Sequence, residues 1–378
     1  MTHRIACVVG ARPNFMKIAP LLEALREKDP SLLLDLIHTG QHYDDRLSKF
    51  LFRDLELPEP DLYLGVGSGS HAEQTAKVMV EFEKYCEEKR PDLVVVVGDV
   101  NSTLACSIVA AKLHIPVAHV EAGLRSRDRT MPEEINRIVT DSLSDVLLTT
   151  CREADQNLIA EGVSPKKIFF VGNIMIDSLK KHLPKATPPV VLESLGGGDR
   201  FGLITLHRPS NVDTPDRLKN LMEVLIEASK ELPLIFPVHP RTQAKMRACG
   251  FRLPVDLEDQ GTCLPETNLW LTPPLGYLEF LYLLEKSRVV FTDSGGIQEE
   301  TTVLGVPCLT LRENTERPIT IEQGTNHLVG VESDTILSTF QAVLQDEHPI
   351  PMTPEKWEGG AALEIADILV DWLRSKDR

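Results

Sequence analysis

Residues 289–300 read Val-Val-Phe-Thr-Asp-Ser-Gly-Gly-Ile-Gln-Glu-Glu, and this stretch indicates the fold of the chain. An apolar strand runs into a polar turn with two glycines, and a helical pattern follows at once. Glycine lets a ligand approach the backbone closely, and the first turn of a helix offers unpaired N–H groups that suit a phosphate. Glu299 and Glu300 are expected at the helix start, where the positive end of the helix dipole favours carboxylates. There they can also accept hydrogen bonds from sugar hydroxyls. The alternative is an ordinary strand-to-helix turn.

Length and composition point to a two-domain globular protein without a nucleic-acid or membrane partner. The chain has 378 residues, of which 42% are hydrophobic and 25% charged, and its formal net charge is −16. Such acidity disfavours nucleic acid, although a few local cations can still hold a small anion. The seven cysteines are scattered and mostly in apolar context, which favours buried free thiols over metal or disulfide use. No signal peptide opens the chain and no apolar run reaches the roughly 20 residues of a membrane helix, so we expect a cytoplasmic protein.

Short apolar runs alternate with helical patterns along the whole chain, which predicts an α/β fold with two Rossmann-like doubly wound domains. The expected strands are residues 4–9, 33–39, 93–97, 117–120, 146–149 and 167–171, then 202–206, 234–238, 268–271, 288–291 and 306–311. The composition shifts near 172–200, where we expect the linker. The N-terminal domain would therefore comprise 1–172, joined by a C-terminal helix within 361–378, and the C-terminal, ligand-binding domain 173–360.

Polar residues follow several of the first-half strands, at the edge of a doubly wound sheet where ligands bind. Arg12 and Lys17 flank a turn after the first strand and suit a diphosphate, or they are solvated surface cations. Asp99 follows five apolar residues and a glycine, and an N-cap is its structural alternative. Glu121 follows another strand, and Glu133 stands three residues after Thr130, a spacing that predicts a capping box.

The second half repeats this pattern with cationic and imidazole side chains. His207 and His239 follow two strands, each next to an Arg or a Pro-Arg pair, although a lone histidine there is more often structural. Arg317 lies after a further strand and is a candidate partner for phosphate. The sequence contains no Walker lysine motif, no Cys or His metal spacing and no G-x-S-x-G nucleophile elbow. These residues suit acid–base work on a substrate with a diphosphate leaving group, in a cleft between the two domains.

With these motifs in order, the chain resembles the non-hydrolysing UDP-N-acetylglucosamine 2-epimerases, which have the GT-B fold. The resemblance covers nearly the whole chain. It is carried by the motifs Arg12-Pro-x-x-x-Lys17, Gly98-Asp99, His119-Val-Glu-Ala-Gly-Leu-Arg125, Pro132-Glu-Glu-x-Asn-Arg137, His207-Arg208, Asp293-Ser-Gly-Gly-Ile-Gln-Glu-Glu300 and Thr315-Glu-Arg-Pro318. It implies interconversion of UDP-GlcNAc and UDP-ManNAc by a cytoplasmic homodimer without an added cofactor or metal, in cell-surface polysaccharide biosynthesis.

The resemblance also implies roles for individual residues. The catalytic positions would be Asp99, Glu121, Glu133 and His207, with the direction of each proton transfer left open. The UDP moiety would be held by Arg12, Lys17, Ser294, Gly295, Gly296, Glu300 and Arg317. Glu300 would meet the ribose and Phe280 the uracil, while His239 would lie beside the diphosphate or a second nucleotide.

Three departures from the family pattern stand out. His207-Arg-Pro-Ser-Asn211 replaces His-Arg-Arg-Glu-Asn, Leu275 takes the place of a Gln near the uracil, and Gln41-His-Tyr-Asp44 differs from the Gln-His-x-x-Gln turn of members activated by UDP-GlcNAc. Other functions stay open: a hydrolysing 2-epimerase releasing ManNAc and UDP, a 2-epimerase of a related UDP-2-acetamido sugar, a GT-B glycosyltransferase, or a nucleotide-sugar sensor.

Overall fold

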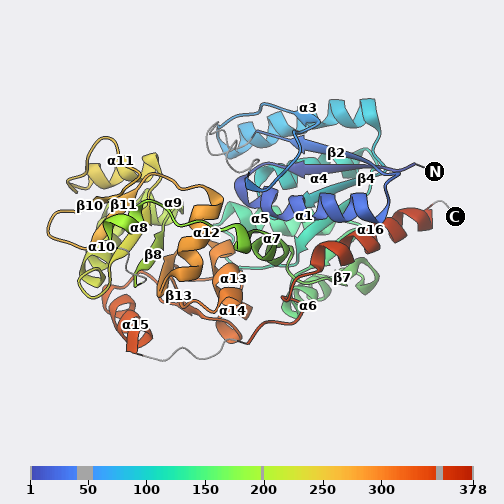
Figure 1. Ribbon diagram of the computed structural model, residues 1–378. Coiled ribbons are helices and arrows are strands. Elements are labelled where there is room, and N and C mark those ends of the chain that lie inside the picture. Colours follow the sequence, from blue (N-terminus) through green and yellow to red (C-terminus); the bar gives the residue numbers. More distant parts are fainter. Residues whose placement is uncertain (1, 41–53, 197–199, 346–351, 377–378) are drawn as a thin grey trace. The chain divides into compact units, whose positions relative to one another are not determined.

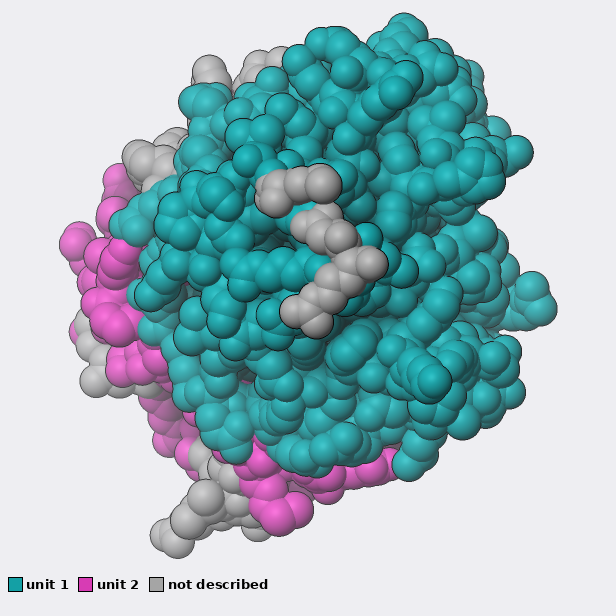
Figure 2. Space-filling model, turned by 90° about the vertical axis from the view of Figure 1, so that its right-hand side faces the viewer, with its two compact units in different colours: residues 1–181, 355–378 teal, residues 182–354 magenta. Residues whose placement is uncertain are grey.

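The computed structural model describes two compact units, each with its own parallel sheet. The described residues are 2–40, 54–196, 200–345 and 352–376, apart from the side chain of Arg12. Unit 1 comprises residues 1–181 and 355–378, and unit 2 comprises 182–354 (Figure 2). The domain limits expected from the sequence, 1–172 with 361–378 and 173–360, differ from these units by about ten residues at the first boundary and stay a prediction.

Unit 1 is built on a seven-stranded sheet in the order β3-β2-β1-β4-β5-β6-β7, with every neighbouring pair parallel. The strands are β1 Arg4–Val9, β2 Leu33–His38, β3 Leu62–Tyr63, β4 Leu93–Val97, β5 Val117–Ala122, β6 Val146–Thr149 and β7 Ile168–Phe170. The helices are α1 Arg12–Lys28, α3 His71–Lys89, α4 Asn101–Lys112, α5 Pro132–Leu143, α6 Arg152–Ala160, α7 Ile174–His182 and α16 Ala361–Lys376 (Figure 1). All five residues of β4 are at most 1% exposed, as a strand covered on both faces requires.

Unit 2 repeats the arrangement, with strand order β10-β11-β9-β8-β12-β13-β14. Its strands are β8 Gly202–Thr205, β9 Leu234–Pro237, β10 Thr262–Cys263, β11 Leu269–Thr272, β12 Val289–Thr292, β13 Cys308–Thr310 and β14 Asn326–Leu328. Its helices are α8 Val191–Ser194, α9 Pro209–Val212, α10 Pro215–Ala228, α11 Pro240–Ala248, α12 Tyr277–Lys286, α13 Gly295–Leu304, α14 Ile319–Glu322 and α15 Ser333–Gln345. Only the β10–β11 pair is antiparallel among these strands. The expected pair of doubly wound sheets is therefore confirmed.

Strand order reverses at one point in each sheet, between β1 and β4 in unit 1 and between β8 and β12 in unit 2. Ligands of doubly wound sheets bind at such switch points, outside the carboxyl ends of the strands. The turns after β4, β8 and β12 carry Asp99, His207 and Asp293, and Lys17 lies in the second turn of α1, the helix that follows β1. The topology thus places the polar motifs where a ligand site is expected.

The C-terminal segment returns to unit 1, where α16 packs along α1. The indole of Trp357 is 1% exposed, and its Nε1 donates to the carbonyl of Thr150 at 3.0 Å. The carboxylate of Asp177 in α7 accepts the N–H of Gly360 at 2.8 Å, which satisfies a donor at the start of α16. The first part of the region expected to be the linker, 172–200, is therefore helical. It forms α7, which binds the C-terminal segment through Asp177.

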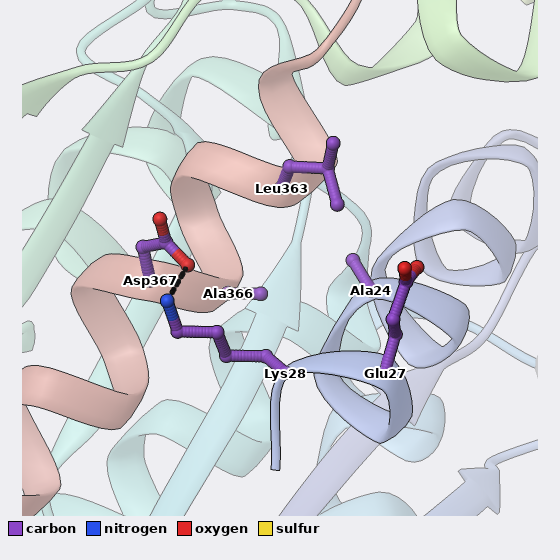
Figure 3. Close-up of a pocket in the computed structure, with 6 residues that line it drawn as sticks. All are labelled: Ala24, Glu27, Lys28, Leu363, Ala366 and Asp367. Atoms are coloured by element: carbon purple, nitrogen blue, oxygen red, sulfur yellow. Dashed lines mark ion pairs between the residues drawn. The ribbon is translucent and has the colours of Figure 1, made fainter.

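A shallow groove lies between α1 and α16 (Figure 3). Lys28 pairs with Asp367 across it at 2.6 Å, and the small side chains of Ala24 and Ala366 let the helices approach. The groove lies near the C-terminal end of α1, whereas Lys17 lies near the other end. It is therefore a feature of helix packing and separate from the strand ends.

All seven cysteines are free, and five of them are buried. Within the described ranges, no helix is both long and apolar enough to span a bilayer.

A buried histidine at the end of β2 makes the stability of unit 1 depend on pH. His38 is 4% exposed, lies against the rings of Phe15 and Tyr63, and accepts the N–H of Gly40 through Nδ1 at 2.8 Å. Burial lowers the pKa of His38 to about 4. The unfolded chain, in which a histidine has a pKa of about 6.5, takes up a proton that the folded chain does not.

The free energy of unfolding should therefore decrease as the pH falls from about 6.5 toward 4. His38→Asn keeps an acceptor near the Nδ1 position but does not titrate, so the variant should show a smaller decrease. Chemical unfolding at several pH values measures both slopes. Parallel pH dependences in the wild type and the variant would show that His38 is not the responsible group.

Candidate active site

Asp99 lies on the polar edge of unit 1, in the turn after β4 and next to Gly98. The N-cap of α4 is Val100, so the N-cap alternative for Asp99 is wrong. Its carboxylate instead pairs with Arg137 of α5 at 2.5 Å, and the Asp99 side chain keeps 25% exposure. A partly exposed carboxylate held by a buried guanidinium is oriented and can still reach a ligand.

Glu121 occupies a strained position at the end of β5. The β5–β6 pairing shifts register between Val120 and Ala122, and Glu121 adopts φ 71°, which is uncommon for a non-glycine residue. Bulges and positive φ angles are concentrated near functional sites because they redirect a side chain. A strained backbone conformation of this kind costs about 1–3 kcal/mol. Here the bulge brings the carboxylate of Glu121 into a buried ion pair with Lys17.

Lys17 links this carboxylate to the switch point. It lies in α1, is 4% exposed, and its Nζ is 3.3 Å from where a Cβ on Gly98 would be. Asn14, one turn earlier, accepts the N–H of Ala11 at 2.9 Å and donates to the carbonyl of Val97 at 2.9 Å. The ammonium group of Lys17 therefore lies where the ends of β4 and β5 meet, and Asn14 ties the turn after β1 to the end of β4.

The first turn of α5 supplies two further carboxylates. The helix begins at Pro132 with Met131 as N-cap, so the capping box expected from Thr130 and Glu133 is wrong. Proline at the first position fixes this start, since it has no N–H to be capped. Glu133 is half-buried in this turn.

Its neighbour Glu134 is 1% exposed and accepts N–H groups of Ser126 and Arg127, both at 2.9 Å. Burial alone would raise the pKa of Glu134, but the hydrogen bonds from Ser126 and Arg137 outweigh it and lower the pKa. Glu134 is thus a structural anion that holds Arg137 against Asp99.

Two expected features of unit 1 cannot be followed to their side chains. Arg12 is the first residue of α1, and its side chain lies outside the described part of the chain. The segment Gln41–Asp44, which differs from the allosteric turn of some relatives, also lies outside the described residues.

In unit 2, His207 and Asp293 meet across the switch point between β8 and β12. Asp293 is fully buried, and its Oδ1 is 3.0 Å from Nδ1 of His207, whose side chain is 59% exposed. The same carboxylate accepts the backbone N–H groups of His207 and Arg208 at 3.0–3.2 Å. Burial would raise the pKa of Asp293, but His207 and these N–H groups lower it. The ionised Asp293 therefore holds the proton of His207 on Nδ1 and leaves Nε2 toward solvent.

The Ser-Gly-Gly turn opens α13, with Ser294 as N-cap and Gly295 as first helical residue. Glu299 and Glu300 lie in the second turn and are buried, so the expectation that they stand at the helix start is wrong. No acidic residue lies in the first turn. The N–H groups and dipole of α13 consequently face no competing carboxylate of their own helix, which strengthens the case for an anion there.

A buried cluster of charges lies beneath this turn. Glu316 pairs with Arg317, with Arg312 at 2.7 Å and with Arg208 at 3.6 Å, and Arg317 also reaches Glu299 at 2.8 Å. Burial would raise the pKa of Glu316, but the three arginines hold it well below its usual value. A Cβ on residue 295 would be 2.4 Å from Nη1 of Arg317, so Gly295 lets the guanidinium lie against the helix start.

The remaining expected binding residues are less specific. His239 is exposed and is the N-cap of α11, where its Nδ1 accepts the N–H of Arg241 at 3.2 Å. Phe280 is half-buried in α12. Ser294 and Gly296 are part of the α13 turn and partly accessible.

The polar edge of unit 1 can do acid–base chemistry, and that of unit 2 can bind an anion and transfer a proton. Sequence reasoning missed Asp293, Arg137 and Asn14 as supporting residues. Asp293 carries the same signal as Asp99, an acid directly after a buried strand. Arg137 carries no local signal, because its partner is 38 residues away.

The profile of the UDP-N-acetylglucosamine 2-epimerase family matches residues 24–370. The chain belongs to the UDP-N-acetylglucosamine 2-epimerase family. It is 42% identical over 351 residues to the UDP-N-acetylglucosamine 2-epimerase of Methanocaldococcus jannaschii, covering 91% of this chain and 93% of the relative. It is also 40% identical over 344 residues to the UDP-2,3-diacetamido-2,3-dideoxy-D-glucuronate 2-epimerase of Pseudomonas aeruginosa, covering 90% and 92%.

A solved structure of this epimerase family shares the fold. The crystal structure of the Methanocaldococcus jannaschii UDP-GlcNAc 2-epimerase in complex with UDP-GlcNAc and UDP matches with a TM-score of 0.86 at 40% identity, covering 97% of this chain and 99% of that one. The resemblance drawn from the motifs and the GT-B fold class are both confirmed. As an epimerase, the chain is an isomerase.

Proposed function

We propose that this epimerase interconverts UDP-GlcNAc and UDP-ManNAc without hydrolysis. The hydrogen at C2 of the sugar has no adjacent carbonyl, so its direct removal is very unfavourable. Loss of UDP from C1 builds positive charge there, which acidifies the C2 hydrogen. The C1–O bond breaks, a base takes the C2 proton, and the C1=C2 bond of 2-acetamidoglucal forms. UDP then adds back to C1 while C2 receives a proton on the opposite face.

The observation that carries the proposal is the set of acid–base groups at the two switch points. Asp99 and the Lys17–Glu121 pair lie at one, and the Asp293–His207 pair lies at the other. Each positioned acid or base contributes about 10²–10⁴-fold to a proton transfer. Proton removal and return on opposite faces need at least two such groups, and the chain supplies them on separate elements.

The departing diphosphate needs positive partners. We propose that the first turn of α13, with Ser294, Gly295 and Gly296, receives it, and that Arg317 adds charge from below. Electrostatic stabilisation of a leaving group by preorganised dipoles and cations is commonly the largest catalytic contribution. Arg12 and Lys17 are proposed to add further positive charge. Glu300 is proposed to bind the ribose and Phe280 the uracil, with His239 beside the diphosphate.

Separation of the reaction products tests whether the enzyme epimerises UDP-GlcNAc without hydrolysing it. Purified protein is incubated with UDP-GlcNAc, and the mixture is resolved by anion-exchange chromatography with a coupled assay for free UDP. We expect UDP-ManNAc at equilibrium with UDP-GlcNAc and no accumulation of free UDP. Stoichiometric ManNAc and UDP would identify a hydrolysing enzyme instead.

A related UDP-2-acetamido sugar is the second candidate substrate. The similarity to the Pseudomonas aeruginosa relative, 40% identical, is nearly as high as that to the Methanocaldococcus jannaschii epimerase, 42% identical. Comparing kcat/KM for UDP-GlcNAc and UDP-2,3-diacetamido-2,3-dideoxyglucuronate decides between them. A higher value for the second sugar would move the assignment to it, since both share the UDP group.

We also propose that the chain forms a homodimer in the cytoplasm, as the resemblance implies. Light scattering of the purified protein measures the mass directly. A mass of one 42.1 kDa chain at assay concentrations would contradict the dimer.

Gly295→Ala should weaken UDP binding at least about tenfold, or roughly 1.4 kcal/mol. The new methyl group would be 2.4 Å from Nη1 of Arg317, so the guanidinium must move away from the α13 turn. Alanine is the better helix former by about 0.5–1 kcal/mol, so the variant should stay folded. Calorimetric titration with UDP measures the change, and Ser338→Ala at an exposed position of α15 is the control. Unchanged affinity in Gly295→Ala would place the diphosphate elsewhere.

A further inference from the structure

The interior of unit 1 contains a charged cluster that the proposed chemistry does not use. His119 and Asp141 are 0% and 2% exposed, and Arg125 is 4% exposed. Nδ1 of His119 is 2.6 Å from Oδ1 of Asp141, and Nε2 is 2.8 Å from the carbonyl oxygen of Gly98. Asp141 Oδ2 is also 2.7 Å from Arg125, which pairs in turn with Glu161 at 2.6 Å. Both oxygens of the buried Asp141 carboxylate are therefore engaged by buried partners, whereas the side chain of Glu161 is 33% exposed.

Both ring nitrogens of His119 face acceptors. A carbonyl oxygen can only accept, so Nε2 must carry a hydrogen. Asp141 accepts the N–H of Gly123 at 3.1 Å and also contacts Arg125. Burial would raise the pKa of Asp141, but His119 and Arg125 outweigh it and lower the pKa. An ionised carboxylate accepts as well, so Nδ1 also carries a hydrogen. The ring is therefore an imidazolium.

The His119–Asp141 pair is linked to the elements that carry all three carboxylates proposed for catalysis. Its partner Gly98 immediately precedes Asp99, and Asp141 binds the N–H of Gly123, two residues after Glu121. Asp141 also belongs to α5, the helix whose first turn contains Glu133. One buried charge pair thus fixes the end of β4, the bulge of β5 and the position of α5.

We propose that His119 and Asp141 are positioning residues that hold Asp99, Glu121 and Glu133 in register for proton transfer. This role rests on the proposed epimerase function. Neither residue needs to touch the substrate. A displacement of about 1 Å in a reacting group can cost about 10²-fold in rate, so a shift of the Gly98–Asp99 turn is sufficient to impair catalysis.

Two substitutions separate the two links of His119. Asparagine places its amide near the Nδ1 position and can keep the bond to Asp141, but it cannot reach Gly98. Glutamine reaches the Nε2 position and can keep the bond to Gly98. We expect His119→Asn to lower kcat about 10²-fold with KM changed less than about threefold. His119→Gln should retain more of the wild-type kcat than His119→Asn.

Tyr85→Phe is the matched control for lost buried polar contacts. The Tyr85 hydroxyl donates to Asp35 at 2.6 Å, and Asp35 also pairs with Arg4 at the first residue of β1. This network lies at the amino end of the sheet, away from Asp99. Its loss should lower the unfolding midpoint and leave kcat within about twofold of wild type.

Nitrogen-15 NMR of the imidazole supplies a readout besides activity. In the wild type, both nitrogens of His119 should carry hydrogens at the pH of the activity assay, with the signal assigned by its absence in His119→Gln. A neutral ring would overturn the proposal, even if the asparagine variant does not fold. Wild-type kcat in folded His119→Asn would overturn the positioning role alone. A wild type that turns over no UDP-sugar would overturn the proposed function and this role with it.

Discussion

Asp99→Asn is expected to lower both epimerisation and solvent exchange of the C2 proton by about 10²–10⁴-fold. The amide has nearly the shape of the carboxylate but cannot accept a proton. Arg137 can still donate to the amide oxygen, so the turn after β4 should keep its conformation. The effect should therefore appear in kcat, with little change in the affinity for UDP. Steady-state kinetics and exchange into D₂O measure the two rates.

A surface aspartate of the same unit provides the control for this substitution. The side chain of Asp145 is 42% exposed, precedes β6, pairs with Lys167 at 3.5 Å and accepts the N–H of Val117 at 3.2 Å, a bond that an asparagine oxygen can keep. Asp145→Asn should leave both rates within about twofold of wild type. Unimpaired exchange in Asp99→Asn would remove Asp99 from the catalytic set and leave Glu121 and Glu133 to supply the base.

His207→Asn is expected to lower kcat by about 10²–10⁴-fold as well. The loop around it should survive, because Asp293 holds the backbone N–H groups of His207 and Arg208 independently of the ring. What disappears is Nε2, the one imidazole nitrogen not turned toward Asp293. Kinetics at several pH values would show the loss of a titrating group from the rate profile.

His327→Asn is the matched control, since His327 is an exposed residue of β14 in the same unit. It should retain the wild-type rate and pH profile. If His207→Asn retained them too, the Asp293–His207 pair would be a structural contact that orders the loop, and proton transfer would have to depend on unit 1.

Much of the fold could be predicted because long apolar runs leave few alternatives. Residues 93–97 are five consecutive Leu and Val, and they form β4 with the expected limits. β3, β10 and β14 were missed, since two or three residues carry no periodicity. The start of α5 was misplaced because Thr130 and Glu133 have the spacing of a capping box, whereas Pro132 determines the first helical residue.

The residues of the candidate site could be found from their positions after strands, but their geometry could not. The bulge at Glu121 depends on the register of β5 against β6. The bond between His119 and Asp141 joins residues 22 positions apart on different elements. Such contacts depend on how the whole sheet packs, and no local pattern in the sequence predicts them.

Proton NMR of UDP-GlcNAc with the protein in D₂O tests the proposed mechanism most directly. Elimination and re-addition predict UDP-ManNAc with deuterium at C2, and deuterium entering the UDP-GlcNAc pool as the reaction reverses. UDP-ManNAc that keeps its original C2 hydrogen would contradict a solvent-exchanging base. Free ManNAc as the accumulating product would contradict the re-addition of UDP.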